Sequence, residues 1–226
     1  MNILEFIKTN FFHVAPIIVV GLIGLAITVE RIQALVLVYP MRGSKYFFEK
    51  VRDLIMGDRI PEAIAFCERY RSKLIAQVVR EGLLRAHQPE SLIEHGLEIA
   101  IGEASEKVQA RTGFLATIAN VATLMGLFGT IIGLIASFEA VGAASAQQRS
   151  ALLAQGISTA MNATMMGLGV AIPCMLAYAF LMNKANRLNA ELDQSAVRTL
   201  DLLKQRYFAS DENKGHHHSK GRVGAV

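Results

Sequence analysis

The sequence has no tryptophan, only two cysteines and only five prolines among its 226 residues. Cys67 lies in a polar region and Cys174 inside a long apolar run, so a structural disulfide is not expected, and neither has a set of neighbouring metal ligands. The consecutive histidines His216–His218 follow no segment that would hold them rigidly, so we predict no functional metal site there. A nucleophile–base pair and a phosphate-binding loop are also missing. We therefore predict that the protein is not an enzyme and uses no cofactor.

Charge is absent from three stretches of the chain. No charged residue occurs between Thr112 and Phe138 or between Ser150 and Asn183, and a shorter charge-free run lies between Lys8 and Glu30. About 20 apolar residues are enough for a helix to cross the hydrocarbon core of a membrane. With hydrophobic residues making up 52% of the chain, these runs predict an all-α membrane protein with three transmembrane helices in contact with lipid.

The first apolar run has an alternative interpretation as a cleaved signal peptide, because Lys8 precedes it and small residues occur at Gly21–Ala26. However, the apolar stretch continues past Glu30 as far as Val38 and contains no convincing cleavage site. We therefore expect a helix that is retained in the mature protein.

The charged residues indicate an orientation rather than a nucleic-acid site. Residues 40–111 hold 12 Lys/Arg and 11 Asp/Glu, interspersed as on a solvated helical surface, so no nucleic-acid partner is predicted. Eight more Lys/Arg follow Asn183, whereas the N-terminus offers only Lys8 and the loop between the last two runs only Arg149. By the positive-inside rule, we predict that residues 40–111 and the C-terminus are cytoplasmic and that the N-terminus lies outside, which for the inner membrane of a bacterium is the periplasm.

The charges and helix breakers divide the chain into seven predicted segments. They are the periplasmic N-terminus with the first span (1–39), a cytoplasmic helical region (40–111), the second span (112–138), a periplasmic loop (139–155), the third span (156–183), a cytoplasmic amphipathic helix (184–209) and a disordered tail (210–226). Within the first cytoplasmic region, Gly57-Asp58 and His87-Gln88-Pro89 separate the expected helices. From Glu90 the apolar residues keep helical spacing with no breaker before Gly113, which predicts one unbroken helix into the second span.

Each of the last two spans carries a stripe of small residues with a threonine in it. The stripes are Gly126, Thr130, Gly133 and Ser137 in the second span, and Ala160, Thr164, Gly167 and Ala171 in the third. This spacing places each set on one helix face, and small faces let helix backbones approach closely in lipid. From the spacing alone, each threonine either packs with its hydroxyl bonded back to its own helix or lines a polar path.

The spans contain more polar side chains than packing needs. These are Asn120, Thr123 and Thr130 in the second span, and Thr159 and Asn162 in the third. An unsatisfied polar group at membrane depth costs several kcal/mol, so each must meet a protein group, water or an ion path. Asn162 lies about 200° around the helix from Thr164, so the third span is expected to have two buried faces.

The spans also lack any acid. Neither of the last two spans contains Asp, Glu, Lys, Arg or His within its apolar run, and Glu30 and Glu139 sit at span ends. Ion and proton movement across a membrane generally uses ionisable groups that bind and release the ion. If this protein conducts protons, the titrating carboxylate must therefore come from another chain.

Two motifs resemble those of the MotA/TolQ/ExbB proton-channel family. Gly126–Gly133, with the sequence GLFGTIIG, is similar to the family's signature in the second span, and Ala163–Pro173, with the sequence ATMMGLGVAIP, resembles its third-span motif. Three spans with a large first cytoplasmic region also match the ExbB/TolQ arrangement. The resemblance implies a homopentameric ring around two copies of a single-span ExbD- or TolR-like partner that carries a membrane aspartate, in which proton flow drives rotation.

The resemblance also implies roles for individual residues. In the family the two span threonines face the partner's aspartate, so Thr130 and Thr164 are expected to line the pore. We add the other polar span residues to the expected pathway, namely Thr123, Thr159 and Asn162. Residues expected to serve helix packing are Gly126, Gly129, Gly133, Gly167, Ala171 and Pro173.

The chain departs from ExbB and TolQ at two positions. It has Thr159 where they carry a glutamate early in the third span, and Thr123 where they carry a proline. These departures leave open a divergent branch, such as a stator for surface motility, and leave the ion open between proton and sodium. The competing hypothesis is a membrane scaffold that does not conduct ions, whose small stripes serve oligomer packing alone.

Overall fold

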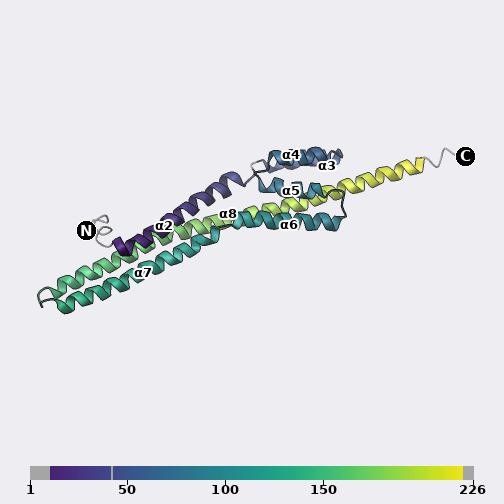
Figure 1. The fold of residues 1–226 in the computed structure, drawn as a ribbon. Coiled ribbons are helices and arrows are strands. Elements are labelled where there is room, and N and C mark those ends of the chain that lie inside the picture. The colour runs from purple at the N-terminus through teal and green to yellow at the C-terminus, as the bar shows by residue number, and fades with distance from the viewer. Residues whose placement is uncertain (1–10, 42, 221–226) are drawn as a thin grey trace. The chain divides into compact units, whose positions relative to one another are not determined.

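The computed structural model describes residues 11–41 and 43–220, with side-chain environments for 15–41 and 43–208. Within that part of the chain every regular element is a helix (Figure 1). In chain order the elements are α2 (Phe11–Ile32), its π-helical continuation η1 (Gln33–Val38), α3 (Ser44–Met56), α4 (Ile60–Arg69), α5 (Leu74–Leu84), α6 (Glu90–Gln109), α7 (Thr112–Ala143) and α8 (Arg149–Lys220).

Three helical stretches are long and apolar enough to cross a membrane. They lie within Ala15–Val38, within Glu90–Ala143 and within Arg149–Phe208, and each contains one of the charge-free runs of the sequence. The prediction of an all-α protein with three potential membrane spans is therefore confirmed by helix length and composition. The oligomeric ring remains a proposal.

The chain divides into two compact units. The first, the membrane unit, comprises the residues up to Gln33 together with 110–183. The second, the charged unit, comprises 34–109 together with the residues from Lys184 onward. Helix α8 contributes to both, because its sequence changes from apolar to charged at Lys184 without a helix break.

Small side chains hold the membrane unit together. Its buried cluster consists of three alanines and a cysteine, Ala119, Ala122, Ala171 and Cys174, with Val20, Ile118 and Val170 packed against it. On α2, a Cβ added at Gly24 would lie 2.8 Å from the Cys174 sulfur, so α2 can approach α8 this closely only because the residue is glycine. Such close approach supplies the van der Waals contact that drives helix association in lipid.

The prediction of one unbroken helix from Glu90 into the second span is wrong. α6 ends at Gln109, and Arg111 has φ 60°, in the left-handed region, before α7 begins. A non-glycine residue in this region costs about 1–2 kcal/mol. Arg111 Nη1 donates to both carboxylate oxygens of Glu30 on α2, each at 2.8 Å, which offsets part of that cost. No glycine or proline lies at residues 109–111, so the break has no local signal in the sequence.

Two other boundaries differ from those expected. α7 continues to Ala143 and α8 begins at Arg149, so the connection between them is shorter than the predicted loop 139–155. This segment is rich in alanine, which favours helix. α8 is helical to Lys220, passing through Gly215, whereas a disordered tail is expected from residue 210. Residues 221–226 and the side chains of His216–His218 lie outside the described part.

Large apolar side chains form most of the core of the charged unit. Fully buried members include Ile55, Leu74, Ile75, Leu83 and Leu192. Two ion pairs, both at 2.7 Å, tie α8 to the rest of the charged unit: Arg206 Nη2 contacts Asp58 in the connection between α3 and α4, and Lys204 Nζ contacts Glu90 at the start of α6. The helices expected between Ser44 and Ala86 are present as α3, α4 and α5, and their ends agree with the Gly57-Asp58 and His87–Pro89 punctuation within two residues.

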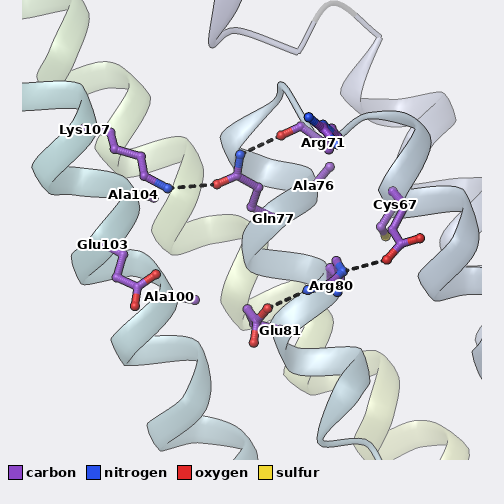
Figure 2. A pocket seen from close by; sticks show the side chains of 11 residues that line it. Cys67, Arg71, Ala76, Gln77, Arg80, Glu81, Ala100, Glu103, Ala104 and Lys107 are labelled. Carbon is purple, nitrogen blue, oxygen red and sulfur yellow. Dashed lines mark hydrogen bonds and ion pairs between the residues drawn. The ribbon is translucent and has the colours of Figure 1, made fainter.

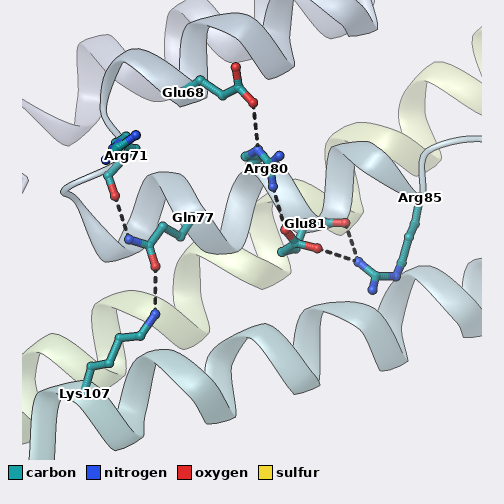
Figure 3. Close-up of polar contacts among 7 residues, drawn as sticks. All are labelled: Glu68, Arg71, Gln77, Arg80, Glu81, Arg85 and Lys107. Atoms are coloured by element: carbon teal, nitrogen blue, oxygen red, sulfur yellow. Dashed lines mark hydrogen bonds and ion pairs between the residues drawn. The ribbon is translucent and has the colours of Figure 1, made fainter.

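A polar groove of about 650 Å³ lies between α4, α5 and α6 in the charged unit (Figure 2). Arg80 on its wall contacts Glu68 at 3.3 Å and Glu81 at 2.8 Å, and Glu81 also accepts from Arg85 at 3.0 Å (Figure 3). Gln77 donates to the Arg71 carbonyl at 2.6 Å. These pairs are at least partly exposed, so each contributes little to stability.

Cys67 lies at this groove with 1% of its surface exposed, and burial raises the pKa of its thiol from 9.0 to about 12. In the unfolded chain the thiol ionises near pH 9. Burial of the neutral thiol therefore contributes fully to the free energy of unfolding below pH 9. This contribution is lost as the pH rises from 9 towards 12, by at most about 1.4 kcal/mol per pH unit. We expect the unfolding temperature in detergent to fall more steeply above about pH 9 in the wild type than in Cys67→Ala. Equal slopes in the two proteins would contradict this.

Candidate ion pathway

Helices α7 and α8 meet along their small-residue stripes. A Cβ added at Gly167 would lie 2.7 Å from the Ala122 carbonyl oxygen and 2.8 Å from the Gly126 Cα, and one added at Gly133 would lie 3.2 Å from the Ala160 Cα. Backbone therefore lies against backbone over about two turns of α8 and about three turns of α7. Only glycine at these positions permits this approach.

The remaining expected packing residues occupy different places. A Cβ added at Gly129 would lie 2.8 Å from the Ala163 Cβ, so Gly129 belongs to the α7–α8 contact. Ala171 is buried in the cluster with Ala122. Pro173 is exposed and lines a groove between α2 and α8 instead of facing α7.

The hydroxyls of the four threonines in the expected pathway donate to backbone carbonyls. Thr164 Oγ1 donates across the helix contact to the Gly126 carbonyl at 3.4 Å, whereas Thr130 and Thr123 donate within α7 to Leu127 at 2.6 Å and to Ala119 at 3.0 Å. Each hydroxyl proton is thus used inside the protein, and the oxygen lone pairs remain available to accept a hydrogen bond.

Three of these hydroxyls share one side of the α7–α8 pair. At about 100° per residue, Thr123 and Thr130 lie about 60° and 40° around α7 from Gly126, and Thr164 lies about 60° around α8 from Gly167. For two antiparallel helices, these rotations carry the side chains to the same side. We call this side, with Thr123, Thr130 and Thr164, the hydroxyl flank.

Helix α2 covers the opposite side of the pair. A Cβ added at Gly24 would meet Ile118 of α7 at 3.1 Å, and one added at Gly21 would meet Val170 of α8 at 3.0 Å. Ile118 lies about 80° around α7 from Gly126, and Val170 lies about 60° around α8 from Gly167. Both rotations run in the direction opposite to those of the threonines. The hydroxyl flank is therefore left uncovered within the described chain, with Thr123 exposed and the other two threonines half-buried.

The other two expected pathway residues are not brought to the hydroxyl flank. Thr159 and Asn162 lie about 80° and 140° around α8 from Gly167, in the sense of α2. Thr159 Oγ1 donates to the Gln155 carbonyl at 3.0 Å, and both side chains are half-buried. The expectation that both faces of the third span are buried stays a prediction, because Asn162 and Thr164 are each only half-buried in the single described chain.

Sequence reasoning missed three contributors to the unit. These are the Gly21/Gly24 face of α2, the Glu30–Arg111 ion pair, and the contact of Gly156 with Ser137, where an added Cβ would overlap the serine side chain. The spacing of Gly21 and Gly24, three residues apart in the first span, was a signal for the α2 face. The ion pair joins residues 81 positions apart and had no local signal.

The family model of the MotA/TolQ/ExbB proton channel family matches residues 69–194, which include all of α7 and the part of α8 that packs against it. The chain belongs to this family. The match covers the glycine contact, the hydroxyl flank and both sequence motifs. The family is described as one of proton channels, and three helices of this chain are long and apolar enough to cross a membrane.

Curated relatives carry TolQ and ExbB names. The chain is 35% identical over 123 residues to the Tol-Pal system protein TolQ of Haemophilus influenzae, covering 53% of this chain and 54% of that protein. It is 34% identical over 111 residues to the biopolymer transport protein ExbB of Salmonella typhimurium, covering 49% and 44%. A putative ExbB homologue of Methanothermobacter thermautotrophicus is 26% identical over 205 residues, covering 90% and 68%. The chain spans about half the length of the TolQ relatives it matches.

Proposed function

We propose that this chain forms the ring of an ion-driven motor in the bacterial inner membrane. In this proposal five copies surround two copies of a single-span partner of the ExbD/TolR type, and the hydroxyl flank lines the central space. The observation that carries the proposal is the hydroxyl flank itself, since three threonines share one uncovered side of a tightly packed helix pair. The hydroxyl protons are bonded to backbone carbonyls, but the oxygen lone pairs can still accept a hydrogen bond on this side, which the described chain leaves open.

The partner supplies the acid in this mechanism. The charge-free runs of α7 and α8 offer hydroxyl oxygens but no carboxylate, so a membrane aspartate from the partner carries the proton. A protonated aspartic acid donates to the threonine oxygens, whose own protons are engaged with carbonyls. Each proton that crosses 100 mV releases about 2.3 kcal/mol, enough to move the partner between equivalent positions in the ring.

The orientation is part of the same proposal. The excess of Lys and Arg in residues 40–111 and after Asn183 favours a cytoplasmic charged unit and C-terminus, with the N-terminus in the periplasm. The driven machine is then an envelope or surface process powered from the inner membrane, and surface motility is one such process.

Reconstitution tests the proposal. We expect vesicles that contain the chain with its single-span partner to take up protons under an imposed potential, and vesicles with the chain alone, or with the partner's membrane Asp replaced by Asn, to take up at least tenfold less. The mass of the purified complex should correspond to five copies of this chain and two of the partner. Equal uptake with and without the partner would reject the mechanism, and no uptake under either condition would favour the scaffold.

A further inference from the structure

A proline in the third span leaves one backbone acceptor without its usual donor. In a regular helix the carbonyl of Gly169 accepts from the amide of residue 173, but Pro173 has no amide proton. Gly169 and Pro173 are both exposed, and a Cβ added at Gly169 would have nothing within 4 Å among the described residues. Such a carbonyl at membrane depth requires another donor.

This acceptor lies at an apolar groove of the membrane unit. Gly169 and Pro173 line a groove of about 400 Å³ between α2 and α8, and Gly21, Leu22 and Leu25 form its other wall. The groove exists because Gly21 and Gly169 carry no side chains. It offers space for large apolar side chains together with one polar group.

An amide without a partner lies at the same depth on α7. Asn120 is exposed, and its side chain makes no hydrogen bond within the described part of the chain. A Cβ added at Gly24 would touch both Ile118 of α7 and Cys174 of α8. These two residues therefore lie at the same depth along the membrane unit. Asn120 lies two residues along α7 from Ile118, a rise of about 3 Å, which brings it level with the Gly169–Pro173 turn of α8.

The two groups cannot meet within one chain. Asn120 lies about 120° around α7 from Gly126, and Gly169 lies about 200° around α8 from Gly167, so both point away from the α7–α8 contact. Large apolar side chains continue the Asn120 side of α7, with Leu124 and Phe128 each 63% exposed. The amide donor and the large apolar side chains of α7 thus complement the carbonyl acceptor and the apolar groove beside α8.

We propose that α7 of one copy packs into the α2–α8 groove of the next copy, with the Asn120 amide donating to the Gly169 carbonyl that Pro173 leaves free. The contact joins two different surfaces of the same chain, and repetition of such a contact closes into a ring. The inference rests on the proposed ring and specifies which surfaces form it.

Disulfide trapping tests the contact. In a Cys67→Ala, Cys174→Ala background, Asn120→Cys combined with Gly169→Cys is expected to give an oxidised ladder of crosslinked copies on denaturing gels. The matched control replaces Phe138, an exposed residue near the far end of α7, in combination with Gly169→Cys, and should stay monomeric. A monomeric Asn120→Cys/Gly169→Cys protein in an intact ring would overturn the proposal.

A double-mutant cycle tests the hydrogen bond. Asn120→Leu leaves the Gly169 carbonyl without its donor, so we expect it to raise the apparent dissociation constant of the ring about three- to tenfold. In a Pro173→Ala background the helix supplies its own amide, and Asn120→Leu should then have almost no effect. An equal effect in both backgrounds would overturn the proposal.

Proton uptake with the single-span partner separates this contact from the proposed function. Wild-type rings that conduct protons but fail both tests overturn the contact alone. Crosslinked rings that take up no protons with the partner support the contact and reject the motor. If the purified chain forms no oligomer, both the proposed contact and the proposed motor are rejected.

Discussion

Replacing Gly167 with alanine is expected to separate α7 from α8. The added methyl group would lie 2.7 Å from the Ala122 carbonyl oxygen and 2.8 Å from the Gly126 Cα, and these are backbone atoms that no side-chain rotation can move. Overpacking of this kind costs about 1–3 kcal/mol, and the larger Gly167→Val should cost more. We expect a fall in unfolding temperature in detergent and less assembled ring, both measured on protein purified from equal amounts of membrane.

Gly142→Ala is the matched control for this substitution. Gly142 lies on α7, and a Cβ added there meets nothing within 4 Å among the described residues. Alanine favours helix over glycine by up to about 1 kcal/mol, so this variant should be at least as stable as the wild type. Equal stability of Gly167→Ala and Gly142→Ala would mean that α7 and α8 are not packed backbone to backbone.

Replacing Thr164 with valine is expected to abolish ion-driven uptake while the ring stays assembled. Valine keeps the shape of threonine but removes the oxygen that accepts from a protonated carboxyl group. Loss of a hydrogen bond to an ionisable group costs about 1.5–3 kcal/mol, which corresponds to about a tenfold to hundredfold lower rate. Thr130→Ala should have a similar effect, because Thr130 lies on the same hydroxyl flank. Proton uptake by vesicles that contain the partner measures both.

Two further variants separate this role from packing. Thr164→Ser keeps the hydroxyl and should retain most of the uptake. Thr159→Val removes a hydroxyl that is equally half-buried and bonded to its own helix, but which lies on the α2 side of α8, so it should leave uptake nearly unchanged. If Thr164→Val and Thr159→Val conduct equally well, the hydroxyl flank is not the ion path.

Periodicity predicted the regular parts of this molecule because their causes are local. Charge-free runs marked the three potential spans, and apolar spacing from Glu90 marked the face on which Ile93 and Leu97 are buried in the charged unit. The spacing of Gly126, Gly133 and Gly167 put each set on one face, and those faces are where α7 and α8 meet.

The features that sequence did not predict depend on contacts between distant residues. The break at Arg111 involves an ordinary helix-forming residue in a left-handed conformation, beside a carboxylate from α2. Likewise, spacing along α8 separates Thr164 from Asn162 but does not say which face α2 covers. That assignment required the contacts of Gly21 and Gly24. Helix faces are local properties, whereas the neighbour of each face is a tertiary one.

The continuity of α8 has a mechanical consequence. Its 72 residues form one helix, about 108 Å long at 1.5 Å per residue. Pro173 lies inside this helix and removes one backbone hydrogen bond from the part of α8 that packs against α7. A helix without interruptions resists bending except where such a bond is missing, so we expect α8 to bend most easily at Pro173.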